Sequence, residues 1–307
     1  MTQCFGVLGL SLVVASLQVP QTPAGGDTVV AWGNDKDGQI EVPAGLGAVH
    51  EIAAGAFHSL AIKNDGSVVA WGRVEPSRVP EGLSSVAAIA GGGFHTVALK
   101  NDGSVIAWGM NTSGQAEVPK GLAPLVAISA GYRHTLALLK DGTILAWGHN
   151  QEGEIKVPSG LSDVIAISAG YHHSLALKRD GTVVAWGYGA NGQTKVPDGL
   201  TGVVAIAAGG LHSVALKKNG TVVAWGANEL GQCNVPKDLS GVIAIAAGYQ
   251  HTVALKKNGT VVAWGDNSRG QTKVPSGLSG VTAIAAGEGH TLALVHGGAI
   301  SDRSPGR

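Results

Sequence analysis

Residues 242–275 read VIAIAAGYQHTVALKKNGTVVAWGDNSRGQTKVP, and variants of this phrase fill most of the chain. Its Ala-Trp-Gly core recurs seven times and holds every Trp of the sequence, at intervals of 39 residues with one interval of 37. A Gly-x-x-His-Ser/Thr phrase recurs at the same interval. A repeat of about 40 residues is typical of a solenoid or a propeller. The repeated residues are Trp32, Trp71, Trp108, Trp147, Trp186, Trp225, Trp264 and His58, His95, His134, His173, His212, His251, His290.

Each repeat has the pattern of short antiparallel strands. Its apolar runs, rich in Val, Ile and Ala, are too short for helices and have no 3.6-residue period. Asp-Gly or Asn-Gly separates two runs in six repeats, and this dipeptide favours tight hairpins. We therefore predict four strands per repeat, the last ending in Val-Pro at an outer edge, where proline is tolerated. Four strands in about 39 residues make one propeller blade, so the sequence predicts an all-β, seven-bladed β-propeller.

The two ends of the repeat region complement each other. The first Trp phrase, residues 28–33, has no His strand before it, and the last His strand, residues 290–294, has no Trp phrase after it. We predict that these two strands pair in one blade and close the ring, which leaves no free sheet edge. The small Ala-Ile-Ala-Ala-Gly strand should line the axis, and each Trp ring should lie between neighbouring blades.

Composition restricts the class of partner. The formal net charge is zero and only 14% of residues are charged, whereas a nucleic-acid-binding domain usually has a basic excess. We therefore expect no nucleic-acid partner. Cys4 and Cys233 are too few for a disulfide framework. A monomer is expected.

Three segments are predicted along the chain. Residues 1–26 form a leader whose apolar run, Phe5 to Leu17, is too short to span a membrane and resembles a signal peptide, although Met-Thr-Gln carries no basic residue. We expect export to an extracellular or periplasmic location and no membrane insertion; a wrongly assigned start would leave a cytoplasmic location open. Residues 27–297 form the propeller, and residues 298–307 form a flexible C-terminal tail.

One face of the propeller varies from blade to blade. The Gly-x-x-His loops and the loops after Trp-Gly should emerge on that face, and the Asp-Gly turns should emerge on the opposite face, beside many Lys residues. All four Tyr and both Phe outside the leader lie in the variable loops. Clustered aromatics are typical of protein interfaces. The candidate partner-binding residues are Phe57, Phe94, Tyr132, Arg133, Tyr171, His172, Tyr188, Tyr249, Asp266 and Arg269.

Several motifs that suggest chemistry are better explained by the repeat. Equivalent His residues on neighbouring blades lie roughly 10 Å apart, too far to share a zinc ion, so we expect each imidazole to bond backbone at a blade end. Residues 187–192 match the dinucleotide-binding fingerprint by letters but are not followed by a helix. Residues 35–38 resemble part of a calcium loop but lack its first and last ligands. We expect no catalytic residues, metal or cofactor.

The phrase at 261–275, together with Ala-Ala-Gly-x-x-His-Thr/Ser-x-Ala-Leu-Lys, resembles the regulator-of-chromosome-condensation repeat family over most of the chain. The short-bladed bacterial members, the group of β-lactamase inhibitory protein II, are most similar. The resemblance implies a seven-bladed propeller that binds proteins without catalysing a reaction. In the inhibitor group, aromatics before the His form the interface. Phe57 and Phe94 match such positions, whereas Arg133, His172 and Leu211 depart from them, as do Gln250 and Gly289.

The sequence favours a non-enzymatic protein-binding propeller, an inhibitor or extracellular adaptor that uses its variable face. Three alternatives stay open. The first is inhibition of serine β-lactamases or penicillin-binding proteins. The second is a polysaccharide-acting enzyme that uses paired acids such as Asp35, Glu152 or Asp266. The third, more distant one is nucleotide exchange on a small GTPase.

Overall fold

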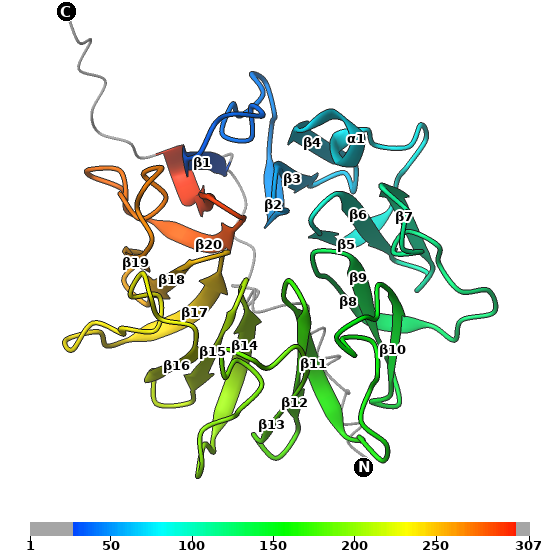
Figure 1. Cartoon of the computed structure of the whole chain (residues 1–307). Coiled ribbons are helices and arrows are strands. Elements are labelled where there is room, and N and C mark those ends of the chain that lie inside the picture. Colours follow the sequence, from blue (N-terminus) through cyan, green and yellow to red (C-terminus); the bar gives the residue numbers. More distant parts are fainter. Residues whose placement is uncertain (1–26, 299–307) are drawn as a thin grey trace, which may run out of the picture.

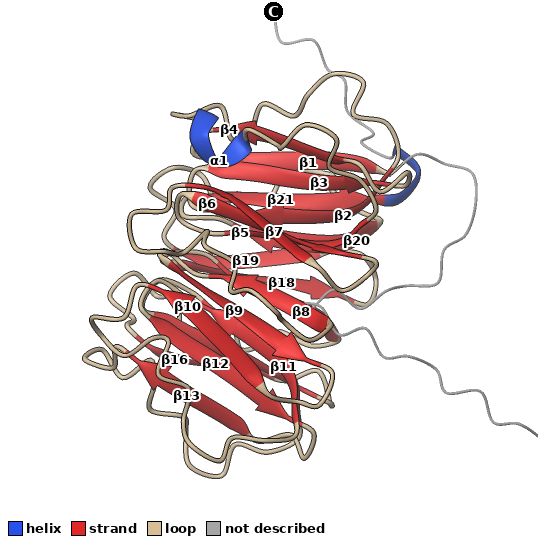
Figure 2. Cartoon of the chain, turned by 90° about the vertical axis from the view of Figure 1, so that its right-hand side faces the viewer, coloured by secondary structure: helices blue, strands red, loops and turns tan. Residues whose placement is uncertain are grey.

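The computed structural model describes residues 27–298, and within them the chain forms seven three-stranded antiparallel sheets arranged in a closed ring (Figure 1). A view at right angles shows the sheets side by side, with loops at both ends of the strands (Figure 2). In chain order the blades are β2 (Val49–Ala54), β3 (His58–Lys63), β4 (Val68–Gly72); β5 (Val86–Gly91), β6 (His95–Lys100), β7 (Val105–Gly109); β8 (Leu125–Ala130), β9 (His134–Leu139), β10 (Ile144–Gly148); β11 (Val164–Ala169), β12 (His173–Lys178), β13 (Val183–Gly187); β14 (Val203–Ala208), β15 (His212–Lys217), β16 (Val222–Gly226); β17 (Val242–Ala247), β18 (His251–Lys256), β19 (Val261–Gly265); and β20 (Val281–Ala286), β21 (His290–Val295), β1 (Thr28–Gly33).

The seventh blade is built from both ends of the propeller, as predicted. Strand β1 pairs antiparallel with β21, from Thr28 opposite Val295 to Gly33 opposite His290. Strand β20 pairs with the other edge of β21. This pairing closes the ring by hydrogen bonds between the first and last strands. The leader and most of the predicted tail lie outside the described residues.

The prediction of a fourth strand in each blade is wrong. The segment that ends in Val-Pro makes its backbone hydrogen bonds locally: Lys273 N donates to Gly270 O at 3.0 Å, and Val274 N donates to Thr272 O at 3.0 Å. Proline then has no N–H to give a neighbouring strand. The side chain of Val274 still packs against the core. The segment therefore covers the blade with side chains without extending its sheet.

The second blade is linked to the third by a different loop. Residues 74–77 form a single helical turn, α1 (Val74–Ser77), where most other repeats have Gly-Gln. Pro76 takes over the role of that Gln, since its carbonyl oxygen accepts a hydrogen bond from Trp108 Nε1 at 3.0 Å. A shorter loop thus keeps the same acceptor. None of the helices within residues 27–298 has the length and apolar character needed to cross a membrane.

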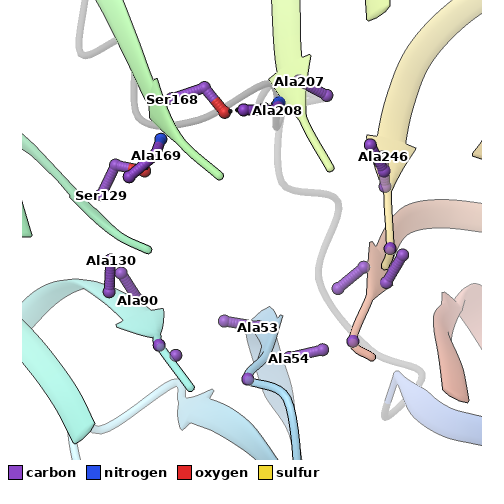
Figure 3. A pocket seen from close by; sticks show the side chains of 18 of the residues that line it. Ala53, Ala54, Ala90, Ser129, Ala130, Ser168, Ala169, Ala207, Ala208 and Ala246 are labelled. Atoms are coloured by element: carbon purple, nitrogen blue, oxygen red, sulfur yellow. Dashed lines mark hydrogen bonds between the residues drawn. The ribbon is translucent and has the colours of Figure 1, made fainter. Parts of the chain in front are cut away.

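The first strand of each blade lies nearest the axis (Figure 1). Seven strands converge there, and small side chains let them approach. Figure 3 shows the ring of Ala side chains, with Ser at two positions. Ser129 Oγ accepts from Ala169 N and Ser168 Oγ accepts from Ala208 N, both at 2.9 Å. The two Ser residues therefore tie neighbouring inner strands together where Ala elsewhere leaves them apart.

The hydrophobic core is divided into layers between adjacent blades. In one layer Val214 and Leu216 of one blade pack with Ile245, Ala254 and Trp264 of the next. The Trp ring therefore lies between blades, as predicted. Every Trp also donates its indole N–H to a carbonyl oxygen of the preceding loop, for example Trp71 Nε1 to Gln39 O at 3.0 Å.

The repeated His residues join neighbouring blades through a hydroxyl group. His58 Nε2 lies 2.9 Å from Thr96 Oγ1, and Thr96 Oγ1 donates to Pro76 O at 2.8 Å. The same relay recurs at all seven boundaries, and it includes His290 to Ser59 at 3.0 Å across the closure. The partner is thus a side-chain hydroxyl, and the expectation of a backbone partner is wrong.

The relay fixes the protonation of the imidazole. Each hydroxyl has a single proton, and it donates that proton to the loop carbonyl. The hydroxyl must therefore accept from Nε2–H, which leaves Nδ1 without a proton. Burial lowers the pKa of these His residues to about 3 or 4, in agreement with a neutral ring. An added Cβ at Gly55 would lie 2.4 Å from His58 Nδ1, so this Gly makes room for the ring.

We expect that deletion of residues 27–33 will lower the thermal stability sharply. The deletion removes β1 and the buried Trp32, and loss of a buried Trp side chain alone typically costs about 3–5 kcal/mol. Differential scanning calorimetry of the full and shortened chains measures the change. Equal melting temperatures would contradict the closure of the ring by β1.

The free energy of unfolding should fall as the pH is lowered from about 6.5 towards 4. Unfolded His takes up a proton near pH 6.5, whereas the seven buried His residues resist protonation down to about pH 3 or 4. Each adds a slope of up to about 1.4 kcal/mol per pH unit in this window. Urea unfolding at pH 7.5, 6.0 and 4.5 gives the free energies. A value that stays constant across this range would contradict the neutral His relay.

A candidate protein-binding face

The loops predicted to share a face do so. In every blade the residue after Trp-Gly donates its backbone N–H to the carbonyl of the residue before the repeated His, as from Arg73 N to Phe57 O at 2.9 Å and from Asp266 N to Gln250 O at 2.8 Å. These bonds hold the two variable loops together at one end of the blade. We call this end the variable face.

Five aromatic side chains form one continuous row on the variable face. The ring centroids are separated by 5.0 Å from Phe57 to Phe94, 5.4 Å from Phe94 to Tyr132, 4.4 Å from Tyr132 to Tyr171, and 4.6 Å from Tyr171 to Tyr249. All five rings are partly exposed. We call these residues the aromatic row. It crosses five blades, although its members are 37 to 78 residues apart in sequence.

Glycine makes room for the Tyr rings of the row. A Cβ at Gly93 would lie 2.5 Å from Tyr132 Cδ2, and a Cβ at Gly210 would lie 2.1 Å from Tyr249 Cδ2. Each Tyr ring therefore lies over the glycine of the preceding blade. The blade that holds Gly210 contributes no ring, and its missing side chain lets Tyr249 reach Tyr171.

A hydrogen bond across the propeller fixes the centre of the row. Tyr171 Oη donates to Glu288 Oε2 at 2.7 Å, from the blade of β11–β13 to the blade of β20, β21 and β1. Burial and the nearby carboxylate of Glu288 raise the pKa of Tyr171 far above its usual range, so the hydroxyl keeps its proton. The two side chains line the end of the central cavity nearest the row.

Two guanidinium groups border the row. Arg73 Cζ lies 5.4 Å from the ring centroid of Phe57 and 5.2 Å from that of Phe94, and Arg133 Cζ lies 5.7 Å from that of Tyr132. These distances are typical of cation–π contacts. The Arg73 side chain, about half exposed, is also 3.9 Å from a carboxylate oxygen of Asp37. The row therefore offers rings and positive charge side by side.

His172 continues the row outward. Its ring centroid lies 6.2 Å from that of Tyr132 and 6.0 Å from that of His149. Both imidazoles face the buried carboxylate of Glu154: His149 Nδ1 contacts Glu154 Oε1 directly, and His172 Nδ1 is 4.0 Å from the same oxygen. Among the described residues, this is the one group of three His, Cys, Asp or Glu side chains close enough to hold a metal ion together.

The remaining predicted residues lie apart from the row. Among the described residues, Tyr188 makes no ring contact with it. The carboxylate of Asp266 is held within its own loop, where it accepts from Ser268 N at 2.8 Å and from Gln271 Nε2 at 2.8 Å. Arg269 is exposed and lies beside Gly289 of the neighbouring blade. These residues could contact only the outer part of a partner.

A central cavity of about 190 Å³ runs along the axis behind the row. Its wall is mostly Ala and Gly from the inner strands (Figure 3). Glu51 stands in the wall where the equivalent position of the other inner strands is Ala, and its Oε1 accepts from Ile89 N at 3.2 Å. Burial raises the pKa of Glu51 to about 7. One acid in an apolar wall cannot form the carboxylate pair that glycoside hydrolysis needs.

Sequence reasoning missed three residues of the face. Arg73 and Glu288 had no signal beyond their place in a variable loop. Glu154 did have one, because five other repeats have Gln at its position. A single departure from a repeated buried residue is visible in the sequence, but its His partners come from two loops that only the fold brings together.

Fold and face together define a closed β-propeller of the repeat type, with a scaffold common to all blades and loops that differ between them. The regulator of chromosome condensation (RCC1) repeat matches at residues 49–73, 86–115, 125–154, 164–193, 203–232 and 242–271, which together make up more than half of the chain. The chain therefore belongs to the RCC1 repeat family. No curated protein sequence is significantly similar to it.

Solved structures share the fold at low sequence identity. Prp20p of Saccharomyces cerevisiae, described with its binding to Gsp1p and histones, is 19% identical with a TM-score of 0.75 and covers 92% of this chain and 93% of its own. Yeast Prp20 in complex with Kap60 is 18% identical with a TM-score of 0.78, over 96% and 95%. Human WBSCR16 is 18% identical with a TM-score of 0.71, over 89% and 100%. At these identities the likeness concerns the fold.

We expect the Tyr171→Phe substitution to lower the free energy of unfolding by about 1.5 kcal/mol. It keeps the ring but removes the hydrogen bond to a carboxylate, and such bonds contribute about 1.5–3 kcal/mol. Partial exposure of Glu288 places the effect at the lower end. The matched control is Tyr132→Phe, whose hydroxyl has no hydrogen-bond partner among the described residues. Urea unfolding compares the two variants, and equal stabilities would contradict a structural role for the bond.

Proposed function

We propose that this propeller is a non-enzymatic binding module that holds a protein partner on its variable face, with the aromatic row at the centre of the contact. The observation that carries the proposal is the row itself. Five rings from five blades touch one another and stay partly exposed on the one face whose loops differ between blades.

The composition of the row supports protein binding. Aromatic side chains and Arg are enriched among residues that dominate interface energetics, since they offer large rigid surfaces at little entropic cost. The rings are held by their neighbours before a partner arrives, which lowers the cost of ordering them. The opposite end has no comparable rings, and its Lys63, Lys100 and Lys178 each lie within 3.8 Å of an Asp carboxylate.

For the partner, we propose first an exported enzyme that the propeller inhibits, with serine β-lactamases and penicillin-binding proteins as the classes to test. Phe57 and Phe94 stand where inhibitor-like relatives carry aromatics, and residues 1–26 have the pattern of an export signal. The finer assignment rests on these two features. An extracellular adaptor that holds a surface protein uses the same face.

The other two functions have weaker support. Prp20p is described as binding Gsp1p and histones, which makes small-GTPase exchange a second assay to run. For a polysaccharide-cleaving enzyme, the acids are poorly placed. Asp35 Oδ1 accepts from Ile40 N at 3.2 Å and Asp266 bonds Ser268 and Gln271, so both carboxylates stabilise their own loops.

We expect the double substitution Phe57→Ala and Phe94→Ala to weaken partner binding by at least about tenfold, because removal of central aromatic anchors typically costs more than 1 kcal/mol. The full chain is tested for inhibition of purified serine β-lactamases, for binding to penicillin-binding proteins, and for nucleotide release from small GTPases. Any partner found is then titrated against both variants by calorimetry.

The matched control is the double substitution Lys63→Ala and Lys100→Ala on the opposite face, which should leave the affinity unchanged. Far-UV circular dichroism shows that both variants fold. An affinity that depends on the Lys pair and not on the Phe pair would contradict the proposal. Release of reducing sugars from polysaccharides by the protein, abolished in Glu152→Gln, would replace it with the enzyme function.

A further inference from the structure

One loop of the propeller replaces a repeated buried amide with a carboxylate. In the other loops that carry Gln, its Oε1 accepts the backbone N–H of the residue two positions earlier, as at Gln39 and Gln115 at 2.9 Å and 2.8 Å. Glu154 Oε2 accepts from Glu152 N at 2.9 Å in the same way. One oxygen of Glu154 therefore keeps the structural role of the repeat, and the second oxygen stands where the others have an NH₂ group.

The second oxygen of Glu154 faces two imidazoles. His149 follows the Trp-Gly of the same repeat, and His172 precedes the repeated His of the next blade. The candidate ligand atoms of the three side chains all lie within 4.8 Å of one another. The Glu154 side chain is fully buried, and those of His149 and His172 are 16% and 34% exposed. The group is thus anchored on the inside and accessible from the variable face.

His172 has spare ligating capacity at this point. Its Nδ1 is a buried atom with no hydrogen-bond partner among the described residues. Burial, with Glu154 acting in the opposite sense, lowers the pKa of His172, so the ring is neutral at pH 7 and its free nitrogen can donate a lone pair. Arg133, whose Nε is also buried there without a partner, adds positive charge nearby.

We propose that His149, Glu154 and His172 form a binding site for a divalent transition metal, with Zn²⁺ as the ion that fits the ligands best. Two imidazoles and one carboxylate are a common zinc ligand set with one coordination position left open. Zinc takes these ligands at about 2.0–2.1 Å, so tetrahedral ligand atoms lie roughly 3.4 Å apart. A small turn of the partly exposed His172 ring brings the present separations to that value.

The surroundings of Glu154 hold the carboxylate in place before a metal arrives. Its carbonyl oxygen accepts from Trp186 Nε1 at 2.9 Å and from Ser174 Oγ at 2.8 Å, both buried bonds to the next blade. His149 N donates to Arg133 O at 2.8 Å. Outer bonds of this kind orient metal ligands and raise affinity. The seven repeated His are not part of this site, because their Nε2 atoms serve the inter-blade relay.

The site adjoins the aromatic row, since the ring of His172 lies 6.4 Å from that of Tyr171, centroid to centroid. The open coordination position is therefore on the face proposed for partner binding. The metal site stands on its own geometry and does not depend on that function.

The test is zinc binding by the full chain after chelator treatment. Isothermal titration with ZnCl₂ at pH 7.5 should give one site per chain, and elemental analysis after dialysis should give one zinc. Excess zinc should raise the melting temperature, because it binds the folded state. Co²⁺ in its place should show the visible absorption of a tetrahedral site. MgCl₂ should show no binding, since Mg²⁺ prefers oxygen ligands in octahedral geometry.

The decisive variant is Glu154→Gln, which restores the residue of the other repeats and so retains the fold. It should weaken zinc binding by at least about 100-fold, since even changes in outer-shell partners cost about 10- to 100-fold. His172→Leu, which copies Leu211 of the next blade, should do the same. His50→Ala removes a His of the inner-strand region outside this group, and should bind zinc like the unchanged chain.

Absence of stoichiometric zinc binding would overturn the proposal, and the His149–Glu154 contact would then be an ion pair without a metal. Zinc binding that survives both Glu154→Gln and His172→Leu would overturn it too, because the ion would lie elsewhere. If Glu154→Gln does not fold, His149→Asn, which copies Asn34 of the first repeat, gives the same test.

Discussion

Each blade of this propeller is joined to the next through one carbonyl oxygen, and the rest of the structure depends on that contact. Gln39 O accepts both from Trp71 Nε1 at 3.0 Å and from Ser59 Oγ at 2.7 Å, and Ser59 Oγ is in turn 3.0 Å from His290 Nε2. All of these groups are buried. Leaving any of them unpaired would cost about 1–3 kcal/mol, so Trp, His and hydroxyl must recur together.

This constraint explains why the loops can vary while the blades cannot. The relay uses the backbone carbonyl of the loop, and a different side chain there can supply the same atom. Pro76 does so with a shorter loop, and Glu154 does so with a charge. Side chains that point outward from these loops are then free to change. The aromatic row and the His149–Glu154–His172 group are both made of such changes.

The sequence predicted much of this fold, because the evidence for it is periodic. Closure of β1 on β21, small residues at the axis and the Trp between blades all followed from the repeat. The number of strands did not. Apolar Val before Pro looks the same whether its backbone pairs or only its side chain packs, and the turn at Gly270 decides in favour of packing. The hydroxyl partner of each His was also out of reach, since it lies on the next blade.

The candidate site could be predicted only as far as the face on which it lies. That Tyr and Phe share a face follows from the strand order, but the order of contacts within the row depends on where glycine is absent or present. Gly210 contributes no ring, and the space it leaves lets Tyr249 stack on Tyr171. Likewise, Glu154 is conspicuous in the sequence only as a departure from Gln, and His172 becomes its neighbour only when two blades are packed. In a closed repeat protein, the scaffold is therefore predictable from what repeats, whereas each site depends on pairs of exceptions in adjacent repeats, about 20 residues apart here.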